Sequence, residues 1–451
     1  MRPIRAAVMS RLIAGAGMRE QFALLDRHRQ LDAPEARQDI ARRMLAQLRY
    51  FASRPDTLPE WQRAAALEGI DELWAAWQEL PVVGKADLRS RFHPRRILEV
   101  ADVKGVASST GGSTGEPSPF LHDTRARKAL RAADWYCKLQ LGWRPGVPIV
   151  CLWGSDRDVG KARSFLGLAR GFVKDFHIVD SYRPSAAMVD RTLALIERKK
   201  PVAMYGFTSL LEFVAREAVK QGYSCPPGAV TTAWNGGEML FDHQVDAFRA
   251  AFGVPILTLY GGRELGAMAF QPSPGAPMTV LRPLVFVELL GGDGREGGPG
   301  APGRLVVTSL VNRGTPFLRY EVGDLATYTV DGRDDSGIRA LDRLLGRSAS
   351  VLALPNGARL HTLFWNHLFK DYPEVEQFQV AVRDGGVEVR LKGQGFGEDR
   401  ERQLRQVLDV TLEGNAFDIR WLEELRLTAQ GKLLQVIDER ATPPRGAGGH
   451  P

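Results

Sequence analysis

The sequence is poor in cysteine and lacks long apolar runs, and both shortages exclude classes of protein. The three cysteines (Cys137, Cys151, Cys225) show no CxxC spacing, so we expect neither a disulfide framework nor a zinc site. No stretch approaches the roughly 18 uninterrupted apolar residues of a membrane-spanning helix. Arg11 interrupts the short apolar run near the N-terminus, so we predict no signal peptide and a reducing, cytoplasmic location.

Lysine is also scarce, and the excess positive charge is unevenly distributed. Of the 60 basic residues, 12 are Lys, and the formal net charge is +7. Residues 1–50 hold 10 Arg against 5 acidic residues, so the rest of the chain is nearly neutral. This distribution argues against a nucleic-acid-binding body. The basic N-terminus could contact an anionic membrane surface weakly, but a solvated helix face is the simpler interpretation.

The remaining composition is that of a folded protein with more than one domain. Hydrophobic residues make up 44% and charged residues 25% of 451 residues, a length that a single core rarely serves. Helical spacing of apolar residues at 36–51 and 61–77 predicts a helical lead-in within residues 1–80. Farther along, apolar runs such as 148–153 alternate with helical patterns, which predicts an α/β fold with mainly parallel sheet.

The chain is expected to divide near Gly346. Residues 1–345 would form a large α/β domain whose part after residue 253 is rich in strands. Residues 346–441 would form a small α+β domain with a hairpin turning at 384–386, a helix at 398–412 and a strand at 417–427. The Pro- and Gly-rich tail, residues 442–451, is predicted to be disordered.

Residues 108–117, SSTGGSTGEP, are the most informative segment for function. They combine five hydroxyl-bearing side chains with three glycines. Hydroxyls and backbone N–H groups can surround phosphate oxygens, and glycine permits a close approach. The segment lacks the Gly-Lys-Ser/Thr end of a Walker A loop and the spacing of a dinucleotide fingerprint. A flexible Ser/Gly linker is the alternative interpretation.

Two carboxylates follow apparent strands in positions suited to binding a nucleotide. Glu264 comes after a Gly-Gly turn at the carboxyl end of a predicted strand, where ligand sites lie in α/β sheets, and it could hold Mg²⁺ bound to ATP. Asp324 follows Gly323 and could accept both hydroxyls of a ribose. Taken singly, a surface Glu paired with Arg263 and a β-turn Asp are the alternatives.

Five segments together resemble the adenylate-forming (ANL) superfamily, and in particular its phenylacetate–CoA ligase and CapK-like branch. The resemblance covers residues 80 to 432. Its five segments are 110–117 (TGGSTGEP), 260–267 (YGGRELGA), 316–325 (PFLRYEVGDL), 345–347 (LGR) and 431–432 (GK), and residues 80–88 (LPVVGKADL) are a further cue for the branch. The family has a large N-terminal domain and a small mobile C-terminal lid, so the resemblance implies the same two-domain fold here.

The resemblance implies roles for individual residues. Glu264 would bind Mg²⁺, Asp324 the ribose, and Lys432 would be the lid lysine that stabilises charge during adenylation. Gly346 and Ser350 would form the hinge. The residues implied to bind ATP or AMP are Thr110, Ser113, Thr114, Gly115, Gly236, Gly237, Glu238, Tyr260, Gly261, Asp324 and Arg347.

The chain departs from the family pattern at Ser118, Arg263 and Ser350, which bears mainly on the second half-reaction. The implied activity is an AMP-forming acid–thiol ligase that uses ATP, Mg²⁺, a small carboxylic acid and, as acyl acceptor, coenzyme A. One alternative acceptor is a carrier-protein thiol, an amine or a sugar hydroxyl in capsule or secondary-metabolite synthesis. Another alternative is a nucleotide-binding scaffold without catalysis. Four aromatic residues could line an acyl pocket or belong to the core: Trp135, Trp153, Phe207 and Trp234.

Overall fold

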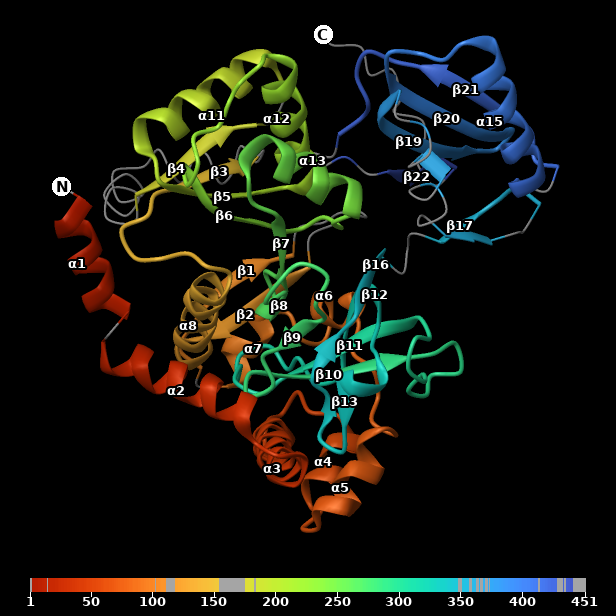
Figure 1. Ribbon diagram of the computed structural model, residues 1–451. Coiled ribbons are helices and arrows are strands. Elements are labelled where there is room, and N and C mark those ends of the chain that lie inside the picture. The colour runs from red at the N-terminus through yellow and green to blue at the C-terminus, as the bar shows by residue number, and fades with distance from the viewer. Residues whose placement is uncertain are drawn as a thin grey trace, which may run out of the picture. The chain divides into compact units, whose positions relative to one another are not determined.

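The computed structural model forms two compact units, residues 1–345 and 346–451 (Figure 1). It describes residues 2–440 except 14, 102, 111–117, 154–174, 182–183, 348–350, 357–358, 362–364, 366–367, 370–371, 373, 413, 428–432 and 434. The predicted tail, residues 442–451, therefore lies outside the described residues.

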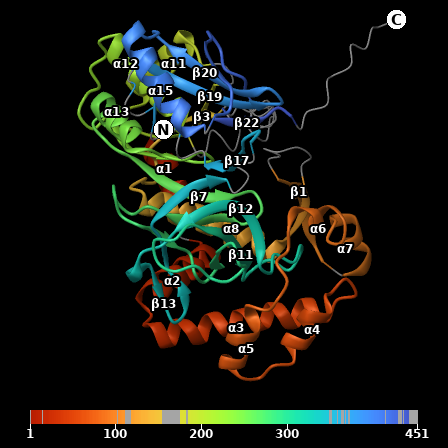
Figure 2. The same ribbon diagram turned by 90° about the vertical axis from the view of Figure 1, so that its right-hand side faces the viewer.

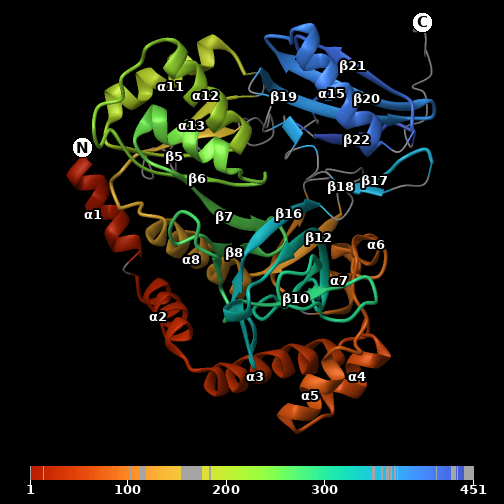
Figure 3. The ribbon, with the colours of Figure 1, turned by 45° about the vertical axis from the view of Figure 1, so that its right-hand side comes forward.

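The helices of the first unit come mainly before the large sheet or between its strands. They are α1 (Arg2–Ile13), α2 (Ala16–Gln30), α3 (Ala33–Ala52), α4 (Pro59–Ala65), α5 (Ile70–Trp77), α6 (Lys85–Arg89), α7 (Pro94–Val100), α8 (Thr124–Gln140), α11 (Ala186–Lys199), α12 (Thr208–Lys220), α13 (Asp242–Phe252) and the 3₁₀ helix η1 (Val330–Gly332). Successive helices α1, α2 and α3 follow one another in Figure 3, and α4 and α5 lie beside α3 in Figure 2.

The strands described in the first unit form four sheets. The strands are β1 (Gly105–Ser109), β2 (Pro119–Asp123), β3 (Ile149–Trp153), β4 (Phe176–Asp180), β5 (Val202–Gly206), β6 (Val230–Asn235), β7 (Ile256–Gly262), β8 (Gly266–Phe270), β9 (Met278–Val280), β10 (Val285–Leu290), β11 (Gly303–Ser309), β12 (Tyr320–Thr327), β13 (Arg333–Asp334), β14 (Gly337–Ile338), β15 (Ala340–Leu341) and β16 (Arg343–Arg347). The largest sheet has the order β15-β9-β8-β7-β6-β5-β3-β4. A second sheet has the order β10-β11-β12-β16, while β1-β2 and β13-β14 form two-stranded sheets.

The large sheet is parallel in one half and antiparallel in the other. Strands β4, β3, β5, β6 and β7 are parallel, and β7, β8, β9 and β15 pair antiparallel. Nearly every residue of β3 and β5 is buried, as expected for parallel strands covered on both faces. Helices α11, α12 and α13 pack against this half (Figure 1). The predicted α/β class is confirmed.

Two predicted elements differ from the structure. The helix expected at 61–77 is divided into α4 and α5, because Gly69 precedes α5 in an extended conformation, with φ −80° and ψ 138°. The strand expected at 417–427 ends at Trp421, and Leu427 makes only an isolated bridge with Leu433. The apolar spacing that predicted one helix continues across the backbone break at Gly69. The apolar run that predicted the longer strand continues across the turn that follows Trp421.

A buried ion pair attaches the helical lead-in to the second sheet. The Arg319 guanidinium contacts the Glu288 carboxylate through Nη2–Oε1 at 3.1 Å and Nε–Oε2 at 3.2 Å, and Trp77 Nε1 donates to the same carboxylate at 3.2 Å. Arg319 Nη1 donates to the carbonyl oxygens of Gln78 and Leu80 at 2.6 and 2.5 Å. Arg319 therefore satisfies backbone acceptors where the lead-in ends, a structural role within the segment 316–325.

In its described residues, the second unit has a four-stranded sheet on which α15 packs and a separate two-stranded sheet. Its elements are β17 (Val351–Ala353), β18 (Arg359–His361), β19 (Val375–Arg383), β20 (Gly386–Gly393), α15 (Glu398–Thr411), β21 (Phe417–Trp421) and β22 (Val436–Asp438), with sheets β17-β18 and β21-β20-β19-β22. Alternation along β19 and β20 separates two faces. Apolar side chains from one face pack with Leu404, Leu408 and Leu412.

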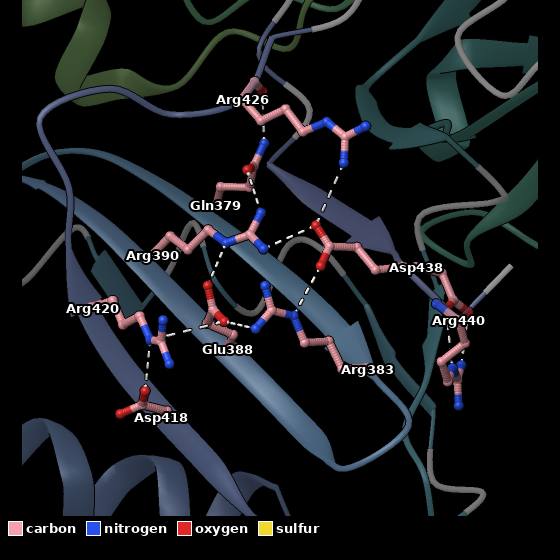
Figure 4. A network of polar contacts seen from close by, with 10 residues as sticks. Gln379, Arg383, Glu388, Arg390, Asp418, Arg420, Arg426, Asp438 and Arg440 are labelled. Atoms are coloured by element: carbon pink, nitrogen blue, oxygen red, sulfur yellow. Dashed lines mark hydrogen bonds and ion pairs between the residues drawn. The ribbon is translucent and has the colours of Figure 1, made fainter. Parts of the chain in front are cut away.

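The opposite face of this sheet carries a network of charged side chains (Figure 4). The Glu388 carboxylate lies between Arg383, which contacts it through Nη1, and Arg390, whose Nε donates at 2.7 Å. Glu439 accepts from Arg383 Nε and Arg390 Nη2, both at 2.9 Å. Gln379 accepts from Arg390 Nη1 at 3.0 Å. The network thus satisfies charged groups on a strand face where Glu388 and Arg390 are buried.

Candidate functional site

The predicted nucleotide-binding segments follow the carboxyl ends of neighbouring strands in the first unit. Segment 235–238 begins at the last residue of β6, and segment 260–264 spans the end of β7 and the turn that follows. Since β6 and β7 are parallel neighbours, these two ends lie at the same edge of the sheet. The fold therefore brings together two of the segments that were predicted separately.

Tyr260 and Asp324 are in direct contact although 64 residues separate them. The Tyr260 hydroxyl donates a hydrogen bond to Asp324 Oδ2 at 2.7 Å. Tyr260 comes from β7 of the large sheet and Asp324 from β12 of the second sheet, and Tyr260 is only 8% exposed. Asp324 is half-buried. A carboxylate held by one phenol retains acceptor capacity for further donors, which suits recognition of a diol.

The backbone at the end of β7 has a bulge that glycine makes possible. Pairing with β8 shifts register between Tyr260 and Gly261, and a Cβ at Gly261 would lie 2.3 Å from the carbonyl oxygen of Gly266. No side chain fits this close approach. Bulges redirect side chains and are frequent beside active sites. The bulge immediately precedes the turn that carries Glu264.

Glu264 is half-buried in the turn between β7 and β8, and two side chains support that turn. The Tyr320 hydroxyl lies 3.5 Å from Glu264 Oε1, a long hydrogen bond. His122 Nε2 lies 2.6 Å from the Glu264 carbonyl oxygen, and a carbonyl only accepts, so this nitrogen carries the hydrogen. Burial lowers the pKa of His122, although the bond to the Glu264 backbone opposes the shift. His122 is therefore best described as a neutral donor that positions the turn.

The hydroxyl-rich loop closes at its base by two hydrogen bonds. Thr110 N donates to the Ser118 carbonyl at 2.9 Å, and Ser118 N donates to Thr110 Oγ1 at 3.0 Å. Both residues are buried, so Thr110 organises the loop base. The loop connects the paired strands β1 and β2, and β2 also carries His122. Ser113, Thr114 and Gly115 lie outside the described residues.

The segment after β6 is held against the N-terminus of α12. Glu238 accepts from Ser209 N at 2.9 Å and from Ser209 Oγ at 3.2 Å, and a carboxylate is favourable at a helix N-terminus. Asn235 Nδ2 donates to Thr208 Oγ1 at 2.7 Å and to the Glu238 carbonyl at 2.9 Å. Glu238 therefore has a capping role that sequence reasoning did not predict.

Gly236 and Gly237 meet backbone requirements within this segment. A Cβ at Gly236 would lie 2.9 Å from the hydroxyl oxygen of Tyr205, and Gly237 has φ +78°. Glycine is favoured at both positions for these reasons. The close approach places the Gly236 backbone against an aromatic side chain.

Three of the four predicted pocket aromatics lie together with one more, Tyr205. Trp153 stacks on Phe207 with ring centroids 4.1 Å apart and on Tyr205 at 5.4 Å, and Tyr205 stacks on Trp234 at 5.8 Å. Phe207 and Trp234 are completely buried, whereas Trp153 and Tyr205 are half-buried. The two buried rings therefore belong to the core, and Trp153 and Tyr205 remain as candidate pocket walls.

The fourth aromatic, Trp135, belongs to a different group. It packs on Trp143 with ring centroids 5.2 Å apart, and Lys138 Nζ lies 4.9 Å from its ring centroid. Both neighbours come from α8 and the turn after it. Helical spacing alone could not separate Trp135 from the stacked aromatics.

The remaining predicted residues lie at the start of the second unit and near its end. Arg347 ends β16, and Gly346 has φ +88°, a conformation that favours glycine. Ser350 and Lys432 lie outside the described residues. Their predicted roles therefore stay predictions.

Sequence reasoning missed His122 and Tyr205 and assigned no side-chain role to Tyr320. Tyr320 lies within residues 316–325, a segment that carries the family resemblance, so the sequence did mark its position. His122 is four residues after Ser118 on a strand paired with β1, and its contact with Glu264 spans 142 residues. No local pattern predicts such a contact.

The geometry offers single carboxylates as possible metal ligands. Among the described residues, no group of three or more His, Cys, Asp or Glu could hold a metal ion. Mg²⁺ in nucleotide sites usually takes one or two carboxylates and completes its shell with phosphates and water. Glu264, half-buried in a supported turn, fits that limited role.

None of the described helices is both long and apolar enough to span a membrane.

Comparisons with known proteins identify the fold. No family model matches the sequence, and no curated protein is similar to it in sequence. The structure is similar to 2-hydroxyisobutyryl-CoA ligase in the postadenylation state with 2-HIB-AMP (17% identity, 91% of each chain, TM-score 0.66). It is also similar to ATP-bound MatB from Rhodopseudomonas palustris (16% identity, 72% of this chain and 65% of that chain, TM-score 0.52).

A third similar structure is the anthranilate CoA ligase AuaEII with anthranoyl-AMP (16% identity, 72% of this chain and 64% of that chain, TM-score 0.51). Two of these three structures contain an acyl-adenylate, and the third contains ATP. The chain therefore has the fold of the adenylate-forming ligases, and the predicted superfamily fold is confirmed.

Proposed function

We propose that this protein is an ATP-dependent ligase of a carboxylic acid that forms an acyl-adenylate and then an acyl-CoA thioester. The observation that carries the proposal is the contact of Tyr260 with Asp324 beside the Glu264 turn, within a fold shared with ligases that bind ATP and acyl-AMP. Sequence motifs that were separate along the chain supply these residues. The phenylacetate–CoA ligase and CapK-like branch remains the proposed assignment within the superfamily.

The first step joins the acid to AMP. A carboxylate oxygen of the acid attacks the α-phosphorus of ATP, the bond to the β-phosphate oxygen breaks, and pyrophosphate leaves. Asp324, oriented by Tyr260, would accept the ribose hydroxyls. Gly236 and Gly237 would let the adenine approach the backbone, and Tyr260 would pack on its ring. Gly261 would shape the adjoining bulge, Arg347 would contact the nucleotide, and residues 110–115 would surround the phosphates.

Charge stabilisation in this step would come from two residues. Glu264 would hold Mg²⁺, which when bound neutralises phosphate charge. His122 and Tyr320 would keep the Glu264 turn in place. We retain Lys432 as the lysine that stabilises developing negative charge, with Gly346 to Ser350 as the hinge of a mobile lid domain.

The second step would transfer the acyl group from AMP to a thiol. The sulfur attacks the acyl carbon, the bond to the phosphate oxygen breaks, and AMP leaves. Coenzyme A is the proposed acceptor. An aromatic acid is the favoured substrate, because the half-buried ring of Tyr205 lies against Gly236 and stacks on the half-buried ring of Trp153.

A two-stage assay tests the proposal. Pyrophosphate release is measured with ATP, Mg²⁺ and a panel of aryl, fatty and hydroxy acids, first without CoA and then with it. We expect acid-dependent release and, with CoA, an acyl-CoA product detected by mass spectrometry. Pyrophosphate release without an acyl-CoA product would indicate that the acyl acceptor is instead a carrier-protein thiol, an amine or a sugar hydroxyl. ATP binding without release for any acid would favour a nucleotide-binding scaffold.

A further inference from the structure

A buried strap, residues 312–315 between β11 and β12, lies against β2, the strand that carries His122. Thr315 N donates to the Leu121 carbonyl at 2.9 Å, and Leu121 N donates to Thr315 Oγ1 at 2.8 Å. These two residues are 194 positions apart in the sequence, and both are completely buried. The strap therefore forms part of the support of β2.

The strap occupies the edge of β2 that β1 leaves free. Thr110 N donates to the Ser118 carbonyl, so the backbone carbonyl of Ser118 faces β1. Leu121 is three residues farther along, and the alternation of an antiparallel pair directs its N–H and C=O to the other edge. A Cβ at Gly314 would lie 2.3 Å from the Leu121 carbonyl oxygen, so only glycine permits this approach.

The Asn312 side chain bonds to β2 on both sides of His122. Its Nδ2 donates to the Leu121 carbonyl at 3.1 Å, and its Oδ1 accepts from Asp123 N at 3.2 Å. The same amide makes two further hydrogen bonds within the strap. Asn312 is 1% exposed. Because Leu121 and Asp123 flank His122, this one amide fixes the backbone from which the imidazole extends.

Two other elements hold the strap itself in place. Asp123, the N-cap of α8, accepts from Arg313 N at 2.6 Å. Arg54, which follows α3, donates from Nη1 to the Gly314 carbonyl at 2.7 Å and from Nε to Asp56 Oδ1 at 2.8 Å. Arg54 and Asp56 are both buried. The strap is thus fixed between α8 and the helical lead-in.

We propose that Asn312 and Thr315 are positioning residues for the phosphate and metal end of the nucleotide site. They hold β2 and, through the hydrogen bond of His122 to the Glu264 carbonyl at 2.6 Å, the turn that carries Glu264. This role rests on the proposed function, in which Glu264 holds the Mg²⁺ of ATP. Without the strap contacts, His122 and the Glu264 turn would lose their fixed positions.

The residues proposed to bind the ribose are anchored independently of the strap. Asp324 accepts from Tyr260, and β12 pairs with β11. Calorimetric titration of the full chain with MgATP and with adenosine therefore separates the two parts of the site. We expect Asn312→Ala and Thr315→Val to bind MgATP about tenfold more weakly, the lower end of the losses typical for residues that support metal ligands, and to keep the adenosine affinity of the parent.

Two controls accompany these variants. Thr315→Ser keeps the hydroxyl that accepts from Leu121 N, so it should bind both ligands as the parent does. Gln244→Ala controls for general loss of stability, because Gln244 is a buried amide of α13 that accepts from Phe241 N at 3.1 Å and donates to Glu212 at 2.6 Å. Thermal unfolding should show a less stable protein, with the affinity for both ligands unchanged.

Spectra of the ligand-free protein test the His122 contact without any nucleotide. The protein is labelled with ¹⁵N-histidine, and the His122 signal is identified by its absence from His122→Gln. In the parent and in Thr315→Ser, Nε2 should carry the proton. Asn312→Ala and Thr315→Val should give a mixture of the two neutral tautomers, because the Glu264 carbonyl would no longer select one of them.

Two outcomes would overturn the proposal. Parent-like spectra and parent-like MgATP affinity in Asn312→Ala and Thr315→Val would show that the strap does not position His122. Equal weakening of MgATP and adenosine binding would show a general loosening of the site. The expected histidine spectra in a protein that releases no pyrophosphate with any acid would support the strap's role and count against the ligase proposal, so the two failures are distinguishable.

Discussion

At the scale of single residues, the structure shows that residues of one motif make different kinds of contact. Tyr260 and Asp324 come from different sheets and meet through one hydrogen bond, so each restricts the other. Arg319, in the same motif as Asp324, instead satisfies backbone carbonyls and a buried carboxylate. One motif therefore holds both a contact between two sheets and a buried ion pair.

Asp324→Ala should weaken ATP binding about tenfold to a hundredfold, because hydrogen bonds to a charged group contribute roughly 1.5–3 kcal/mol each. Tyr260→Phe should have a smaller effect, since it removes only the group that orients the carboxylate. Calorimetric titration with ATP measures both. Asp384→Ala, in an exposed hairpin turn, is the control. Unchanged ATP affinity in a folded Asp324→Ala protein would reduce Asp324 to a strand residue without a binding role.

Arg319→Gln should destabilise the first unit by about 3–5 kcal/mol, because removing one partner leaves the buried Glu288 uncompensated. Arg304→Gln is the matched control: its ion pair with Glu321 at 2.8 Å is partly exposed, and such pairs contribute roughly 0–1 kcal/mol. Urea unfolding followed by tryptophan fluorescence measures both. Similar midpoints for the two variants would contradict the assignment.

The same pair predicts how stability changes with pH. Burial raises the pKa of Glu288 from its ordinary 4.5 to about 7, although Arg319 opposes the shift. The native state then binds more protons than the unfolded state, so this contribution is present below pH 4.5 and is lost as pH rises towards 7. Arg319→Gln removes the opposing charge, so its destabilisation should grow with pH.

At the scale of elements, polar residues at strand ends and on strand faces contact side chains or backbone groups of neighbouring elements. Strand ends in the large sheet carry the candidate site, while the network of Figure 4 lies on the face of the second unit's four-stranded sheet opposite its apolar core. Glu238 shows the same principle, because it stabilises the start of α12 and thereby fixes the segment after β6. Residues of this kind contribute by holding an element in place.

Glu439→Gln should loosen the four-stranded sheet of the second unit at neutral pH by about 1–3 kcal/mol. Burial alone would raise the pKa of Glu439, but hydrogen bonds from Arg383 and Arg390 outweigh it and lower the pKa below its ordinary 4.5. The stabilisation is therefore present above pH 4.5 and is lost as pH falls through the lowered value.

Hydrogen–deuterium exchange of peptides from β19, β20 and β22 measures this effect. Asp409→Asn, at an exposed position of α15, is the control and should not change protection. A difference between Glu439→Gln and the parent that persists undiminished in acid would show that the ionised carboxylate is not the source of the stabilisation.

At the scale of the whole molecule, the two compact units hold different parts of the proposed machinery. Glu264 and Asp324 belong to residues 1–345, and Lys432 belongs to residues 346–451. If residues of both units serve one reaction, losing a residue of the second unit should impair catalysis without impairing ATP binding.

Lys432→Ala should keep the ATP affinity of the parent and lose pyrophosphate release about a hundredfold, since removing one preorganised charge contact costs roughly 3 kcal/mol at the transition state. Lys392→Ala, a lysine of β20 in the same unit, is the control. Thioester formation from supplied acyl-adenylate should survive in both variants. Release at the parent rate in Lys432→Ala would contradict its proposed role.

The sequence by itself determined the local structure and the fold class. Apolar periodicity predicted α3 and α15, and a short apolar run predicted β3, because side-chain spacing follows directly from helix and strand geometry. Glu264 follows β7 as predicted, but Gly261 and Gly262, which were expected to form a turn, belong to the strand itself and pair with β8. Predictions failed where a local break interrupted the pattern, as at Gly69.

Only the tertiary structure decided which distant residues meet. Tyr260 reaches Asp324 because β7 and β12 belong to neighbouring sheets, and His122 reaches Glu264 from a strand 142 residues away. The capping role of Glu238, the buried pair of Arg319 and the contacts of the strap with β2 are likewise products of packing. Local periodicity records which face of an element is buried, but not which of many possible partners packs against it, because that choice depends on the free energy of the whole fold.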